Sequence, residues 1–214
     1  MKDHGAIISG LREALRKPLP GYDGFLEKAG YSRSEIDAAF HKDASPKESA
    51  VLVLLFPRGQ ELHTLLMLRP DYAGVHSGQV SFPGGRCEPT DADHWATALR
   101  EFKEETGIVL DRPEALGNLS KLYIPPSRSL VYPCVAFAQE IGQATPDPRE
   151  VVELFEVPVD AIMGPDVVKH REQFIAVANR PVMVPYFDLG GKVVWGATAM
   201  MLWELRETMR ALMR

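Results

Sequence analysis

The sequence has few cysteines, no long apolar run and no excess of positive charge. Its two cysteines, Cys87 and Cys134, are too few in 214 residues for a disulfide framework, and such sparse use is typical of a reducing compartment. The longest apolar run, residues 50–56, falls far short of the roughly 18 residues that a membrane-spanning helix needs. No long apolar stretch follows the first lysine, so we expect no signal peptide. These absences predict a cytoplasmic protein without a membrane partner.

Charge and composition narrow the class of protein further. Lys and Arg number 24 against 29 Asp and Glu, a formal net charge of −5, so no global basic field attracts nucleic acid. Hydrophobic residues make up 45% of the chain and charged residues 25%, which is the balance of an ordinary globular domain. We therefore expect no nucleic-acid partner. A phosphate group would have to bind local basic side chains or a metal ion.

The hydrophobic pattern divides the chain near residue 45. Residues 6–16 and 34–41 have helical spacing, and Ser45-Pro46 then interrupts the pattern. Strand-like runs follow, with 50–56 and 62–68 as an antiparallel pair. We expect further strands at 119–124, 131–138, 151–155, 173–177 and 192–195, and helices at 91–106 and 197–213. This order predicts an α+β domain over residues 46–214, preceded by a short helical N-terminal extension over residues 1–45.

The helix expected over residues 91–106 has two distinct faces. At about 100° per residue, its apolar side chains share one arc, formed by Trp95, Ala98, Leu99 and Phe102. Glu101, Glu104 and Glu105 lie on a neighbouring arc. Taken alone, such a triplet is most often a solvated surface, because glutamate is a good helix former.

The position of the three glutamates favours a metal site over a solvated surface. They lie in the last two turns, where the helix dipole disfavours each negative charge by about 0.3–1 kcal/mol. Glu101 and Glu105 also repel each other at a spacing of i,i+4. A divalent cation would neutralise this charge, and oxygen donors without Cys or His suit Mg²⁺ or Mn²⁺. The preceding Gly84-Gly85 pair permits a tight turn that brings a backbone carbonyl to the same ion.

Residues 84–108 resemble the Nudix box. They read GG-x5-D-x8-REFKEETGI, against the usual G-x5-E-x7-R-E-U-x-E-E-x-G-U, in which U is aliphatic. They depart from it in three ways: Asp91 replaces Glu, one extra residue precedes Arg100, and Phe102 fills an aliphatic position. The resemblance implies a Nudix-type α/β/α sandwich with a mixed central sheet. It also implies an enzyme that hydrolyses a nucleoside diphosphate linked to another group.

The same resemblance implies roles for the residues of the box. The metal ligands would be the Gly85 carbonyl, Glu101, Glu104 and Glu105. Arg100 would orient a glutamate through a charge-assisted hydrogen bond, and we assign Asp91 a structural role only. Metal ions held by carboxylates would neutralise the diphosphate, activate a water molecule and hold the leaving group.

The upstream segment, residues 65–85, resembles the coenzyme A pyrophosphatase branch of the Nudix hydrolases. It reads LLMLRPDYAGVHSGQVSFPGG, against L-L-T-x-R-S-x2-L-x2-H-x-G-Q-V-x-F-P-G-G, and it departs at Met67, Pro70 and Ala73. The resemblance implies cleavage of coenzyme A or acyl-CoA to 3′,5′-ADP and 4′-phosphopantetheine. The candidate substrate-binding residues are Arg69, His76, Gln79, Phe82, Tyr123 and Arg128. Core packing is the alternative role for Tyr123, and a solvated charge is the alternative for Arg128.

The sequence leaves several alternatives open. In related enzymes a glutamate from a later loop or strand joins the metal site or acts as base, and both Glu150 and Glu153 fit that description. The substrate is also open, since ADP-ribose or NADH would suit the same class of enzyme. A catalytically silent domain that senses a nucleotide is a further alternative, which the intact glutamates disfavour. The small-molecule partner is thus predicted only by class, and the oligomeric state is undetermined, with a homodimer as one option.

Overall fold

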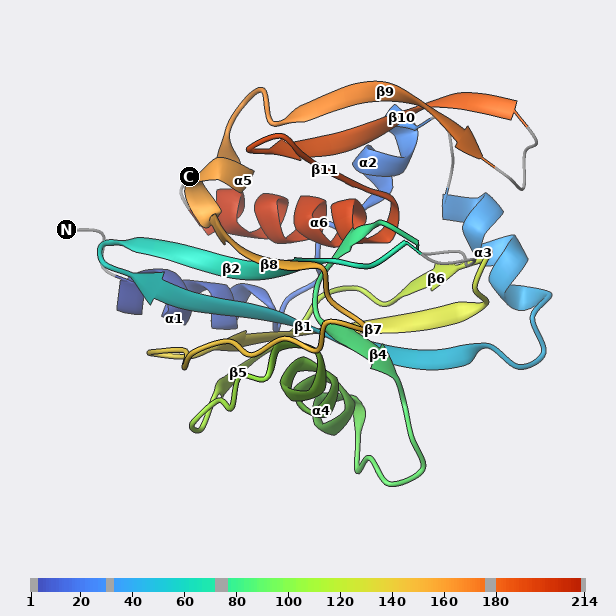
Figure 1. Cartoon of the computed structure of the whole chain (residues 1–214). Helices are drawn as coiled ribbons and strands as arrows, with labels where there is room; N and C mark the ends of the chain where they lie inside the picture. Colours follow the sequence, from blue (N-terminus) through green and yellow to red (C-terminus); the bar gives the residue numbers. More distant parts are fainter. Residues whose placement is uncertain (1–3, 30–32, 72–76, 176–179, 213–214) are drawn as a thin grey trace.

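A mixed eight-stranded sheet forms the centre of the computed structural model, which describes residues 4–29, 33–71, 77–175 and 180–212. Its main strands follow the order β3-β2-β1-β7-β5 (Figure 1). They are β1 (Lys47–Arg58), β2 (Glu61–Leu68), β3 (Val80–Ser81), β5 (Glu114–Asn118) and β7 (Ser129–Phe137). Three short strands complete the sheet, β4 (Gly84–Arg86) on β1, β6 (Leu122–Ile124) on β7 and β8 (Glu153–Pro158) on β2.

Strand β1 lies at the centre of this sheet and is buried on both faces. It pairs antiparallel with β2, as the sequence predicts, and parallel with β7. Because side chains alternate along a strand, Leu52, Leu54 and Phe56 enter the core on one face. Val53 and Leu55 enter the core on the opposite face. A continuous apolar run is what a strand covered on both faces requires.

Helix α4 (His94–Thr106) covers one face of the sheet (Figure 1). The Asp93 carboxylate caps its first turn, and the helix ends at Gly107 in the left-handed conformation. Ala98 and Phe102 pack against β1 in the smaller of the two cores. The helix thus buries its apolar stripe as expected and leaves the adjacent stripe to the glutamates.

The opposite face is covered by helices from both ends of the chain (Figure 1). These helices are α1 (His4–Ala14), α2 (Asp23–Lys28), α5 (Val159–Met163) and α6 (Gly196–Leu212). A second, three-stranded antiparallel sheet packs on α6 and consists of β9 (Val168–Ile175), β10 (Arg180–Leu189) and β11 (Lys192–Trp195). Helix α3 (Arg33–His41) contacts β6. The architecture is an α+β sandwich around a mixed sheet, and no helix in the described part of the chain has the length and apolarity to span a membrane.

The helices of the first 45 residues pack closely on the rest of the chain. Ile8 and Leu11 of α1 and Phe25 and Leu26 of α2 belong to the same core as α6. The helical character of this segment follows the prediction, with α2 as an additional element between the two expected helices. The division of the chain at residue 45 into extension and domain stays a prediction.

Some strands differ from the sequence pattern. β5 and β10 were not expected, since β5 is short and polar and β10 contains two prolines. The run expected at 119–124 begins only at Leu122, because Ser120 is held in a loop by the buried Glu204 carboxylate. That carboxylate accepts the Ser120 N–H at 2.7 Å and its hydroxyl at 2.6 Å.

Candidate active site

Glu105 is the most buried of the three glutamates on α4, with a side chain only 2% exposed. One carboxylate oxygen accepts the Gly84 N–H at 2.7 Å, and the other accepts Arg69 Nη1 at 3.2 Å. Burial raises the pKa of Glu105 to about 7 in spite of these partners, and the charges of Glu101 and Glu150 act in the same direction. A cation beside this carboxylate would relieve the cost of ionising it.

Glu101 lies directly against the backbone of β4. A Cβ atom added to Gly85 would lie 2.4 Å from the Glu101 carboxylate, so only glycine allows this approach. Burial raises the pKa of Glu101 as well, while Arg100 lowers it and the charges of Glu104 and Glu150 raise it. Several negative groups therefore share a partly buried space beside the glycine pair.

The Arg100 side chain ties two of the glutamates to the loop that precedes α4. Its Nη1 donates to Glu101 at 2.9 Å and to Glu104 at 3.1 Å. Its Nε and Nη2 donate to the two oxygens of Asp91 at 3.0 and 2.9 Å, and Nη2 also donates to the Arg86 carbonyl at 3.0 Å. Hydrogen bonding to Arg100 holds the pKa of Asp91 well below its usual range. Asp91 thus fixes the guanidinium that in turn orients the carboxylates.

Glu150 and Glu153, the two candidates for a further acidic group, differ in their surroundings. Glu150 is exposed in the segment before β8, and its charge raises the pKa of both Glu101 and Glu105. Glu153 on β8 instead forms an ion pair with Lys192 of β11. Glu150 is therefore the candidate whose charge acts on the glutamates of α4.

The predicted substrate-binding residues fall into separate groups. Arg69 follows β2 and lies beside Glu105, and its backbone N–H donates to the Gln79 carbonyl at 3.0 Å. Phe82 is 1% exposed and packs in the larger core, so its ring has a packing role. His76 lies outside the described residues.

Tyr123 and Arg128 both bind Asp43, which follows α3. The Tyr123 hydroxyl donates to Asp43 Oδ2 at 2.6 Å, and Arg128 Nε donates to the same oxygen at 3.0 Å. This cluster joins the end of the N-terminal helices to β6 and to the turn before β7. No sequence signal pointed to Asp43, which lies more than 80 residues from Arg128 along the chain.

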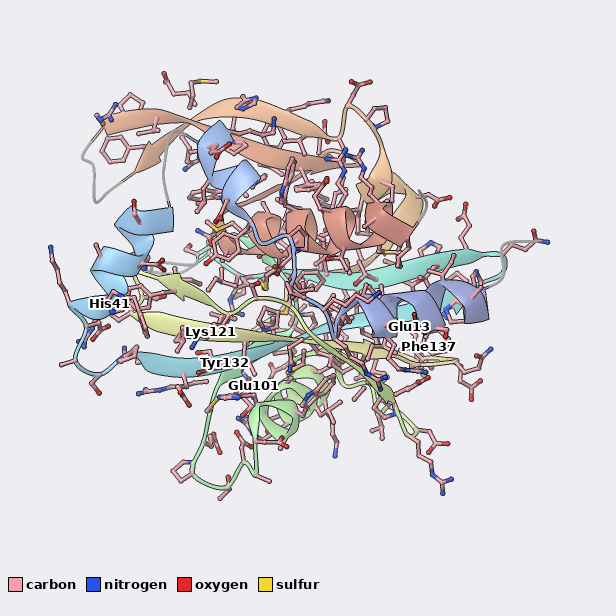
Figure 2. All side chains as sticks on the ribbon, turned by 180° about the vertical axis from the view of Figure 1, so that it is seen from behind. Glu13, His41, Glu101, Lys121, Tyr132 and Phe137 are labelled. Carbon is pink, nitrogen blue, oxygen red and sulfur yellow. The ribbon has the colours of Figure 1, made fainter. Side chains whose placement is uncertain are left out.

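The residues beside β4 fit a hard divalent cation. The available donors are oxygens, namely the carboxylates of Glu101, Glu104 and Glu105 and the carbonyl of Gly85. The glycine pair brings backbone against carboxylate, and Glu105 has its pKa raised by burial among further negative groups. Figure 2 shows Glu101 on α4 beside the strand that carries Tyr132. The Gly84 N–H bond to Glu105 was not foreseen, although the Gly-Gly pair was the signal for a close approach.

Comparison with solved structures supports the fold. The crystal structure of a Nudix hydrolase from M. smegmatis, RenU, superposes with a TM-score of 0.52 at 19% identity. The match covers 78% of this chain and 88% of that one. At this level of identity the likeness concerns the fold alone.

Comparison with known sequences identifies the family. The family model for the NUDIX domain matches residues 46–177. The mouse protein named peroxisomal coenzyme A diphosphatase NUDT7 is 37% identical over 161 residues, covering 75% of this chain and 66% of that protein. The human protein named mitochondrial coenzyme A diphosphatase NUDT8 is 35% identical, covering 73% and 66%, so the chain matches just under two thirds of each relative's length. A Yersinia pestis protein, named as the uncharacterized Nudix hydrolase NudL, is 31% identical over 95% of both chains. The chain therefore belongs to the NUDIX family.

Proposed function

We propose that this protein hydrolyses the diphosphate bond of coenzyme A or acyl-CoA, yielding 3′,5′-ADP and 4′-phosphopantetheine. The observation that carries the proposal is the meeting of Glu101, Glu105 and Arg69 at the Gly84-Gly85 pair of strand β4. That pair ends the segment that resembles the coenzyme A branch and begins the segment that resembles the Nudix box. Two relatives named as coenzyme A diphosphatases support the same substrate.

In this proposal the oxygen donors of α4 and β4 hold Mg²⁺ or Mn²⁺, which supply charge neutralisation and lower the pKa of water. The ligands are the Gly85 carbonyl, Glu101, Glu104 and Glu105. Arg100 keeps Glu101 and Glu104 in place through its hydrogen bonds and is itself fixed by Asp91. Glu150 is the preferred base, because its charge already acts on Glu101 and Glu105.

Arg69 has a second role toward the substrate. One of its terminal nitrogens binds Glu105, its side chain is 25% exposed, and its buried Nε has no partner among the described residues. The guanidinium is therefore positioned to bind a diphosphate oxygen next to the cation site. His76 and Gln79 from the same segment stay proposed substrate contacts, as do Tyr123 and Arg128. For the latter two, the hydrogen bonds to Asp43 would have to be replaced by bonds to the substrate or kept alongside them.

The direct test is an assay of coenzyme A, acyl-CoA, ADP-ribose and NADH with Mg²⁺ or Mn²⁺, with products identified by mass. We expect 3′,5′-ADP from coenzyme A, and turnover lowered by orders of magnitude in Glu104→Gln and Glu105→Gln. Arg69→Ala should lower kcat/KM by an amount that corresponds to a loss of about 1.5–3 kcal/mol of transition-state stabilisation, the scale of a charged hydrogen bond. Dephospho-CoA should be a poorer substrate, since it lacks the 3′-phosphate.

The same assay separates the alternatives. If ADP-ribose or NADH were turned over about tenfold better than coenzyme A, the assignment of coenzyme A as substrate would be wrong, and the assignment as a diphosphate hydrolase would stand. Binding without turnover of any of these compounds would identify a silent nucleotide sensor. The cytoplasmic location stays a prediction, because the mouse relative is named peroxisomal and the human one mitochondrial. A homodimer likewise stays an open option.

A further inference from the structure

A second group of metal-ligand side chains lies at the opposite end of α4. Glu48 comes from β1, Cys87 follows β4, and His94 is the first residue of α4. One ligand atom from each of the three lies within 4.8 Å of the others. Residues from three separate elements thus converge on one point.

The spacing of these atoms suits a tetrahedral metal. His94 Nε2 lies 3.3 Å from Glu48 Oε2. Nitrogen and oxygen ligands that each bind zinc at about 2.0–2.1 Å are about 3.3 Å apart in a tetrahedral site. The Cys87 Sγ lies within 4.8 Å of both atoms, and it would have to be drawn toward them if it is further away than about 3.6 Å, the separation expected in such a site.

The Tyr132 side chain holds both His94 and Glu48 in place. The Tyr132 ring stacks on the His94 ring, with centroids 3.6 Å apart and planes 12° from parallel. The Tyr132 hydroxyl donates to Glu48 Oε1 at 3.3 Å and leaves Oε2 facing the histidine. An outer hydrogen bond to a carboxylate ligand is a usual feature of metal sites.

The donor set differs in kind from that of the glutamates on α4. Thiolate and imidazole donors favour Zn²⁺ and similar ions over Mg²⁺, whereas the glutamates offer oxygen alone. His94 and Glu101 are separated by seven residues of helix, about 10 Å along the axis. The two groups therefore differ in chemistry and lie toward opposite ends of α4, and the chain from Gly85 to Cys87 connects them.

We propose that Glu48, Cys87 and His94 bind a Zn²⁺-class cation as a three-ligand site that is separate from the glutamate site. Glu48 and Cys87 line an open surface pocket of about 440 Å³, whose lining also includes Lys47, Arg86 and Arg128. Three protein ligands would leave a fourth coordination position for water or a small anion, which could enter through this pocket. This proposal does not depend on the substrate or on the hydrolase reaction.

Coordination has a defined chemical and structural consequence. Cys87 binds a metal as the thiolate, so a protonated thiol must lose its proton when the metal binds. Formation of the sulfur–metal bond breaks the S–H bond and releases the proton to solvent. The bound ion would then join the loop after β4, the start of α4 and the start of β1. Metal binding should consequently raise Tm.

The test uses Co²⁺ as the probe, titrated into the full chain with Mg²⁺ in excess to occupy the glutamate site. We expect thiolate-to-cobalt charge-transfer absorption in the near ultraviolet, which stoichiometric Zn²⁺ removes by competition. Cys87→Ser should abolish this absorption, and Cys134→Ala, which removes the other cysteine, should retain it. Glu104→Gln should retain it too, because that residue belongs to the other group.

Two further variants keep the test decisive if Cys87→Ser folds poorly. His94→Gln should weaken cobalt binding strongly, and Tyr132→Phe should weaken it about 10- to 100-fold, the usual effect of losing an outer hydrogen bond. Absence of the absorption in the wild-type protein would overturn the proposal. Persistence of the charge-transfer absorption in Cys87→Ser, or unchanged cobalt affinity in His94→Gln, would also overturn the proposal. A failed coenzyme A assay would leave all these readouts unaffected.

Discussion

The burial of Glu105 predicts a pH dependence of stability when divalent cations are removed by a chelator. In the folded protein the pKa of Glu105 is raised to about 7, against an ordinary value of 4.5. Below pH 4.5 the carboxyl is protonated in both folded and unfolded chains and contributes no difference. Between pH 4.5 and 7 the unfolded chain ionises first, so the free energy of unfolding falls as the pH rises.

The size of the effect follows from the two pKa values. Each tenfold difference in proton affinity is worth about 1.4 kcal/mol, so the difference between 4.5 and about 7 costs the folded state about 3 kcal/mol above pH 7. This is a sizeable fraction of the stability of an ordinary domain, which is about 5–15 kcal/mol. Addition of Mg²⁺ should restore most of the loss, since the cation favours the ionised carboxylate.

Urea unfolding at a series of pH values in EDTA measures this directly, with wild type compared to Glu105→Gln. The substitution removes the charge and also alters the bonds to Arg69 and Gly84, but those changes shift the curve by a constant amount. We expect the difference between the two proteins to change by about 3 kcal/mol between pH 4.5 and 8. Glu104→Gln is the matched control, because it removes a negative charge of the same helix from a side chain that is 57% exposed, and the pH-dependent loss caused by Glu105 should remain in it. A curve for Glu105→Gln that runs parallel to wild type would refute the reasoning.

Other predictions concern single side chains. Gly85→Ala should abolish turnover while the chain stays folded, because the new Cβ would lie 2.4 Å from the Glu101 carboxylate; wild-type kcat in a folded variant would contradict this. Glu150→Gln should lower kcat, whereas Glu153→Gln should lose only the ion pair with Lys192 and keep kcat. Steady-state kinetics in which Glu153→Gln has the larger loss of kcat would identify Glu153 as the base. Cys134 should react far more slowly than Cys87 with a thiol reagent at pH 8, because burial raises the pKa of Cys134 to about 12 and its side chain is fully buried; mass mapping of the modified peptides checks the order.

Local features of the site could be predicted from the sequence, and long-range features could not. Helix α4 and its three glutamates follow from spacing within about two turns, so periodicity and the box resemblance were enough. The Gly84-Gly85 pair correctly predicted a close approach of backbone to the helix. The bond from Arg69 to Glu105, by contrast, joins residues 36 positions apart and depends on where β2 ends relative to α4.

The candidate substrate residues illustrate the same limit. The expectation for Tyr123 was a contact with substrate or a place in the core. The residue is buried in the core, and its hydroxyl also binds Asp43, which belongs to a segment that the sequence left without a role. The convergence of Glu48, Cys87 and His94 was also invisible, since their spacing of 39 and 7 residues matches no local metal-binding pattern. Which charged groups meet depends on the tertiary structure, and contacts between residues distant in the chain leave no local pattern from which they could be predicted.

The parallel pairing of β1 with β7 also determines when the site can form during folding. Lys47 pairs with Ser129 and Leu55 with Phe137, so each contact closes a loop of 82 residues. Loops of this length close late, because their entropy cost precedes any gain from packing. Helix α4 lies within that loop and packs on β1 and β7 as well as on β4, so the surroundings of its glutamates are complete only once β1 and β7 have paired. A bound cation should therefore slow unfolding and leave the folding rate almost unchanged.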